Sequence, residues 1–164
     1  MKMRSMIFLP LVAAVVAGNA VAEEAMTIQV KRLSLQTAQG IANAAIEACR
    51  GEGIQIAVAV LDRDGTEQVV MRDTIAAPIT VPISRDKAYT SVMFNAATSA
   101  MADRANTPIG RQPRLVMSPG GLPIEVGGSL LGGVGVSGAP SGETDEKCAQ
   151  AGIDAVLDDL EMAD

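Results

Sequence analysis

The chain has 164 residues, a formal net charge of −6 at pH 7, two cysteines and no histidine or tryptophan. This acidic balance argues against nucleic acid and anionic membrane surfaces as partners, because both attract basic proteins. Without histidine the chain cannot form a Ser-His-Asp triad, a Cys-His pair or an imidazole metal site, and two distant cysteines do not make a zinc site.

The N-terminus has the three parts of a secretory signal peptide. Two basic residues come first, an apolar stretch follows over residues 6–16, and an A-x-A cleavage site ends at Ala22. The apolar stretch is too short to span a bilayer, which needs roughly 20 residues. We therefore expect residues 1–22 to be removed, residues 23–164 to fold as one domain, and the protein to be periplasmic or secreted, with no membrane attachment in its mature form.

Helical spacing of apolar residues predicts a first helix that begins after the capping residue Ser34 and ends at Gly51. An apolar run over residues 54–61 predicts a buried strand, and an Asp-Gly turn leads into a second strand over residues 66–72. The next segment, residues 73–83, contains two prolines and is expected to be a loop.

Ser84 is expected to cap a second long helix that runs to about Asp103. A loop over residues 104–113 should follow, and a last helix should run from about Glu143 to Glu161. Between them, short strands are expected over residues 114–117, 123–126, 129–131 and 133–137. Because tight turns rather than crossover helices join these strands, the sheet should be antiparallel.

Nine of the 16 glycines lie between residues 120 and 142. Residues 133–138 read G-x-G-x-x-G, but the dinucleotide-binding fingerprint also needs a βαβ unit and an acidic residue about 20 positions further on. The chain ends in a helix instead, so a strand bent by glycines is the better interpretation.

This glycine-rich stretch, the acidic segment that follows it, and the runs at residues 62–65 (DRDG) and 85–88 (RDKA) resemble the GlcG/HbpS family of haem-binding-like proteins. The family includes the C-terminal domain of PduO-type proteins, and the resemblance covers roughly residues 33–160. It implies an α+β fold with a largely antiparallel five-stranded sheet flanked by helices, and a homo-oligomer.

The resemblance also implies haem as a candidate ligand, although iron is usually held by histidine and this chain has none. The side chains left as candidate iron ligands are Met71, Met93, Met101, Met117 and Tyr89, together with weaker oxygen donors. Methionines more often fill gaps in a core than ligate metals. The chain is therefore expected to be an exported small-molecule-binding protein, with haem as one candidate ligand.

A ligand site is expected where the glycine-rich turns meet the start of the second long helix, because glycines permit close approach and helix N-termini attract anions. Arg85 or Lys87 would supply positive charge. The wall would be formed by Gly120, Gly121, Pro123, Gly133 and Ser137. In the alternative interpretation these glycines only satisfy the geometry of the sheet.

A second hypothesis is a small lyase or hydrolase that acts on an organic acid or carbonyl compound through Lys87 with Asp86 or Glu125. Ser84 and Lys87 also match the S-x-x-K motif of serine nucleophiles, but its companion motifs are absent and capping by Ser84 is simpler. The missing histidine favours binding without catalysis, because histidine is the commonest general acid and base.

Cys49 and Cys148 are expected to form one intrachain disulfide, because an exported chain with two cysteines meets an oxidising compartment. Cys49 falls in the last turn of the first helix and Cys148 in the first turn of the last helix. These turns are neighbours if the two helices lie antiparallel on one face of the sheet. The alternative is two separately buried thiols.

Overall fold

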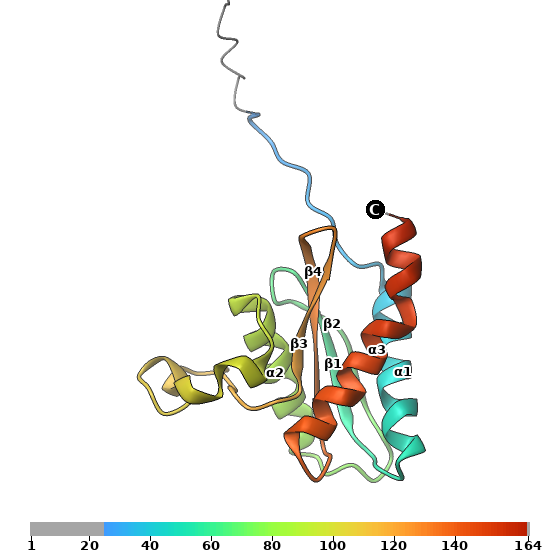
Figure 1. The fold of residues 1–164 in the computed structure, drawn as a ribbon, viewed down its shortest axis with the longest axis vertical. Coiled ribbons are helices and arrows are strands. Elements are labelled where there is room, and N and C mark those ends of the chain that lie inside the picture. The colour runs from blue at the N-terminus through green and yellow to red at the C-terminus, as the bar shows by residue number, and fades with distance from the viewer. Residues whose placement is uncertain (1–24, 164) are drawn as a thin grey trace, which may run out of the picture.

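The structure is a computed structural model that describes residues 25–163, so the expected signal peptide and its cleavage site at Ala22 lie outside the described residues. In chain order (Figure 1) the elements are α1 (Leu35–Gly51), β1 (Ala57–Asp62), β2 (Glu67–Arg72), α2 (Thr80–Phe94), the 3-10 helices η1 (Thr98–Arg104) and η2 (Ile109–Arg111), β3 (Gly121–Val126), β4 (Ser129–Ser137) and α3 (Gly142–Met162). None of the described helices combines the length and hydropathy needed to cross a membrane.

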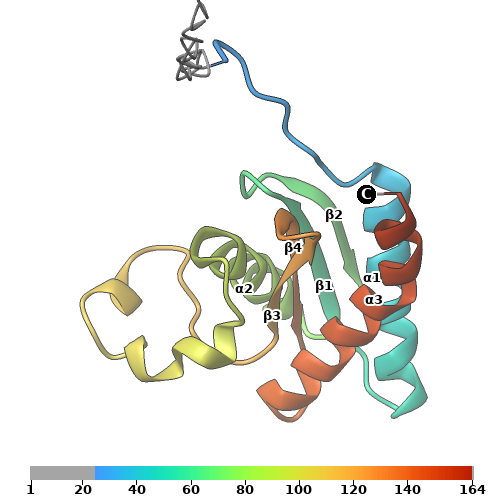
Figure 2. The ribbon, with the colours of Figure 1, turned by 45° about the horizontal axis from the view of Figure 1, so that its top comes forward.

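A four-stranded sheet separates two helical layers, as Figure 2 shows. The strand order is β2-β1-β4-β3, and every neighbouring pair is antiparallel. One face is covered by α2, and the other by α1 and α3, which lie side by side. The α+β architecture with an antiparallel sheet is therefore confirmed, whereas the five-strand count is wrong.

The segment 114–117, expected to be a strand, is a loop. Arg114 has a positive φ of 67°, and the Val116 N–H bonds to the side chain of Thr90 on α2 instead of to a neighbouring strand. The Thr90 hydroxyl accepts from the Val116 N–H at 2.9 Å, donates to the Asp86 carbonyl of its own helix at 2.7 Å, and lies 3.3 Å from the Arg114 carbonyl. The two strands expected at 129–131 and 133–137 are a single strand, β4, since Gly132 continues both ladders.

The second helix, α2, begins and ends earlier than the sequence predicts. It starts at Thr80, because Pro82 in the first turn needs no N–H partner. Ser84 lies inside the helix and donates its hydroxyl to a carbonyl of the preceding turn, so its expected role as a cap is wrong. The helix ends at Phe94, where Asn95 adopts the left-handed conformation.

A disulfide joins α1 to α3, as expected. The Cα atoms of Cys49 and Cys148 are 5.6 Å apart and both side chains are buried. The two helices run in opposite directions (Figure 1), which brings the end of α1 to the start of α3. Gly152 lets them approach closely, because a Cβ there would lie 2.6 Å from the Ile41 carbonyl.

Glycines also seat α2 on the opposite face of the sheet. A Cβ on Gly133 would lie 2.6 Å from Cγ2 of Val92, and a Cβ on Gly135 would overlap the Ser84 carbonyl. A Cβ on Gly121 would likewise overlap the Lys87 carbonyl. The G-x-G-x-x-G stretch is thus the surface on which α2 packs, which supports the interpretation that these glycines serve sheet and helix packing.

Candidate functional site

Lys87, expected to face a ligand, is buried between α2 and the start of α3. Its Nζ donates to Asp145 Oδ2 at 2.8 Å and to the Val136 carbonyl at 3.0 Å, and only 3% of the residue is exposed. Burial raises the pKa of the Asp145 carboxyl, whereas hydrogen bonds from Lys87 and from the Ala139 N–H act in the opposite direction. The ion pair ties α2, β4 and α3 together.

Two of the predicted wall residues close over this ion pair. Gly120 has a φ of 122°, and a Cβ there would lie 2.7 Å from Lys87 Nζ. Gly121 lies against the backbone of Lys87. The structure therefore brings Lys87, Gly120 and Gly121 together, around a buried ion pair.

The remaining predicted wall residues lie in the sheet. Pro123 on β3 pairs with Gly133 on β4, beneath α2. Ser137 is buried at the end of β4, where it pairs with Ala57. Arg85 lies on the other side of α2 from Lys87, because two helical positions turn the side chain by about 200°. Ligand binding by these residues stays a prediction.

The three side chains of the lyase or hydrolase hypothesis point to three different partners. Lys87 is occupied by Asp145. The Asp86 carboxylate lies 3.6 Å from Arg114 Nε, and the Glu125 carboxylate accepts from the Asn95 amide at 2.7 Å. These contacts do not assemble a lysine with a carboxylate at an open site.

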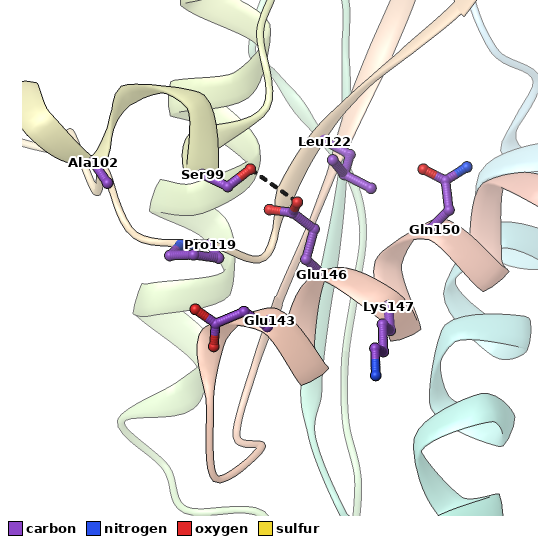
Figure 3. Close-up of a pocket in the computed structure, with 8 residues that line it drawn as sticks. All are labelled: Ser99, Ala102, Pro119, Leu122, Glu143, Glu146, Lys147 and Gln150. Atoms are coloured by element: carbon purple, nitrogen blue, oxygen red, sulfur yellow. Dashed lines mark hydrogen bonds between the residues drawn. The ribbon is translucent and has the colours of Figure 1, made fainter.

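A groove of about 480 Å³ opens between η1 and the first turns of α3 (Figure 3). Its lining comprises Ser99, Ala102, Pro119, Leu122, Glu143, Glu146, Lys147 and Gln150. None of the seven predicted ligand residues is among them. Glu146 already accepts hydrogen bonds from the Ser99 hydroxyl at 2.8 Å and the Gly120 N–H at 3.1 Å. Nothing in the sequence indicates this groove, because its walls come from three separate segments, residues 99–102, 119–122 and 143–150.

A different set of side chains lies on the flank of α2 beside the β1–β2 hairpin. Arg85, Tyr89 and Met93 follow one another at four-residue intervals and therefore share this side of the helix. We call these three residues the Tyr89 flank. Met93 is 43% exposed, and Tyr89 is half-buried. The spacing is visible in the sequence, although the prediction did not use it.

Two further residues complete the surroundings of Tyr89. The guanidinium carbon of Arg114 lies 3.9 Å from the centre of the Tyr89 ring, a cation–π contact. Gly65 in the β1–β2 turn packs against the ring edge, since a Cβ there would lie 3.0 Å from Tyr89 Cδ2 and 2.9 Å from Met93 Cε. Arg114 comes from the loop before β3, so only the folded chain brings it to the flank.

The arginines of this region are held loosely. Arg85 Nη2 lies 3.2 Å from a Glu67 carboxylate oxygen, with both side chains about 40% exposed. Arg85 Nε is buried and has no hydrogen-bond partner within residues 25–163. Arg114 is 47% exposed, and its ion pair with Asp86 is long, at 3.6 Å. Exposed ion pairs of this kind contribute little to stability, so an anionic ligand can compete for both arginines.

A family model described as "Haem degrading protein HbpS-like" matches residues 33–154. Among curated proteins, Protein GlcG of Escherichia coli (strain K12) is 33% identical over 108 residues, which are 64% of this chain and 81% of that protein. Corrinoid adenosyltransferase PduO of Salmonella typhimurium is 29% identical over 131 residues, which are 76% of this chain and 39% of PduO.

Two solved structures are similar to this chain over most of its length. A double mutant of Streptomyces reticuli HbpS is 35% identical with a TM-score of 0.77, covering 85% of this chain and 97% of that one. A PduOC:haem complex is 29% identical with a TM-score of 0.70, covering 76% of this chain and 94% of that one. The similarity therefore extends to the whole domain, helices and sheet included.

Proposed function

The chain belongs to the HbpS-like family, and we propose on this basis that it is an exported protein that binds haem. The observation that carries the proposal is the likeness to the PduOC:haem complex, at 29% identity over 94% of that chain. We propose binding without catalysis, because Lys87, the lysine of the enzymatic hypothesis, is buried and occupied.

The side chains of the groove between η1 and α3 do not suit haem. Its lining holds no imidazole, thiolate, thioether or phenol, which are the groups that hold haem iron in proteins. The Tyr89 flank does suit haem, because a phenol and a thioether lie beside two arginines that can pair with the propionates. Haem bound there would supply a redox-active, Lewis-acidic iron, and this chain would hold and orient it.

A titration of the purified full chain with ferric haem tests the proposal. We expect the Soret band to shift and to saturate at one haem per chain. Iron-free protoporphyrin is the matched control, and it should bind more weakly because it cannot be ligated. An absorbance that rises linearly with added haem, as it does for haem in buffer, would refute haem binding.

Export is proposed from the signal-peptide pattern that ends at Ala22. N-terminal sequencing of protein collected outside the cytoplasm should begin at Glu23. A substitution of the cleavage-site alanine, Ala22→Arg, should leave a longer, membrane-associated precursor. Protein that retains Met1 outside the cytoplasm would contradict the proposal.

We also propose that the protein is a homo-oligomer. Three isoleucines support this, since Ile75, Ile79 and Ile109 are 78%, 64% and 36% exposed. Small residues on α2 permit close helix packing, but Ala88 and Ser91 use it within one chain, where they are buried against the sheet. Light scattering at micromolar concentration should give a multiple of the chain mass, and a monomer mass would refute the proposal.

A further inference from the structure

We infer that Tyr89 is the residue of this chain that ligates haem iron, in a site formed by the Tyr89 flank of α2, the β1–β2 turn and Arg114. This inference rests on the proposed haem binding and states where on the fold the haem binds. Tyrosine oxygen is an established axial ligand of haem iron in proteins that do not use histidine.

Burial and position separate the five methionine and tyrosine candidates. Met101 and Met117 are 4% and 5% exposed, and a haem cannot reach their sulfur atoms without opening the fold. Met71 is half-buried like Tyr89, but it packs against the core on the α1 face of the sheet, away from the Tyr89 flank. Met93 and Tyr89 lie side by side on one flank of one helix.

The hydroxyl of Tyr89 is free to accept a new bond. It makes no hydrogen bond within residues 25–163. The oxygen is not buried either, because the buried side-chain atoms without a partner in this part of the chain do not include it, so it is open to solvent. On ligation the phenolic O–H bond breaks, its proton passes to solvent, and the oxygen binds iron. The guanidinium of Arg114 at 3.9 Å from the ring centre offsets the negative charge left on the phenolate.

The remaining surroundings match the rest of a haem. Met93 and the half-buried Val70, which joins the apolar cluster under α2, offer apolar surface to a porphyrin ring. A propionate that displaces Glu67 from Arg85 would also give the unpartnered Nε of Arg85 an acceptor. Iron ligand, apolar contact and cationic groups thus meet at one place.

The test compares the ferric-haem complexes of the wild type and of Tyr89→Phe, which removes one oxygen and keeps the ring. Met101→Leu, at a buried position away from the flank, serves as the matched control, and Met93→Leu tests the alternative ligand. We expect Tyr89→Phe to lose at least tenfold in haem affinity and to change the visible spectrum, with the spectrum of Met101→Leu unchanged. Circular dichroism confirms that each variant is folded.

Resonance Raman spectroscopy of the wild-type complex is a second readout that needs no variant. The chain contains one tyrosine, so iron-bound phenolate bands would come from Tyr89 alone. If the wild type binds haem but shows no such bands, and Tyr89→Phe binds it unchanged, the inference is wrong while the proposed function stands. A spectral change in Met93→Leu alone would assign the iron to Met93 instead. If the wild type binds no haem, the proposed function and the inference both fail.

Discussion

Lys87 Nζ lies 2.8 Å from Asp145 Oδ2, and both side chains are buried where α2, β4 and the start of α3 meet. The two residues are 58 positions apart in the chain. A pair of opposite charges in such a place is costly to break, because the charge left behind has neither water nor a partner.

We predict that Asp145→Asn lowers the free energy of unfolding by about 3–5 kcal/mol, since it strands the Lys87 charge. The double variant Lys87→Met/Asp145→Asn should recover part of this loss. Urea unfolding of the two single variants and the double variant gives the coupling between the residues. If the stability losses of the two single variants add up to that of the double variant, Lys87 and Asp145 do not stabilise each other.

The single variant Lys87→Met should behave differently with pH. Burial already raises the pKa of Asp145, and without Lys87 nothing of opposite charge opposes that rise. A carboxyl whose pKa is raised in the folded state binds its proton more tightly there than in the unfolded state. Lys87→Met should therefore gain stability as the pH falls from neutral toward 4. The double variant, which lacks this carboxyl, is the reference. A constant difference between the two across that window would contradict this expectation.

The disulfide prediction concerns stability in the presence of reductant. The bond between Cys49 and Cys148 closes a loop with a sequence separation of 99 residues. The chain-entropy model assigns such a loop about 4–5 kcal/mol, which strain reduces. Urea unfolding should shift to lower concentration once the wild type is fully reduced, while Cys49→Ala/Cys148→Ala should be insensitive to reductant. Equal shifts in both proteins would show that the bond does not stabilise the fold.

The prediction for acid stability concerns Arg50 and Asp73. Arg50 Nε and Nη2 donate to the two carboxylate oxygens of Asp73 at 2.7 and 2.8 Å, and this lowers the pKa of Asp73 to about 2. Because the folded pKa is depressed, the contribution is complete above about pH 4 and is lost as the pH falls toward 2. The stability difference between the wild type and Arg50→Gln should shrink over that window, whereas a constant difference would contradict the assignment.

The glycine prediction separates a packing surface from a ligand wall. In Gly135→Ala the new Cβ would overlap the Ser84 carbonyl and lie 2.5 Å from the Ala88 nitrogen, both on α2. Overpacking of this kind costs about 1–3 kcal/mol. Gly51→Ala is the matched control, because no atom lies within 4 Å of the added Cβ and its φ is not positive. Equal stability of the two variants would show that α2 does not press on β4.

Local signals in the sequence predicted those parts of the fold that local interactions decide. Ser34 caps α1 through the Thr37 N–H, and the Asp-Gly turn joins β1 to β2, both as expected. The same reasoning misplaced the start of α2, because Pro82 suggests a loop when it is taken alone but is acceptable in the first turn of a helix.

The candidate site was less predictable, because distant partners decide it. Nothing near Lys87 in the sequence indicates that it will form a buried ion pair with Asp145. Likewise, nothing near Arg114 indicates that its guanidinium will stack on the Tyr89 ring. The disulfide was predictable because two cysteines allow one intrachain pairing. The family resemblance supplied the architecture, and the fold then distinguished the surface candidates for iron from the buried ones.

Hydrogen–deuterium exchange of the full chain, with and without saturating ferric haem, tests most directly whether haem binds on the Tyr89 flank. We predict slower exchange in the β1–β2 turn, residues 63–67, and along residues 85–94 of α2, with no change over residues 143–150 beside the groove of Figure 3. Slower exchange confined to residues 98–104 and 143–150 would place haem in that groove and contradict the account, as would an exchange pattern that haem leaves unchanged.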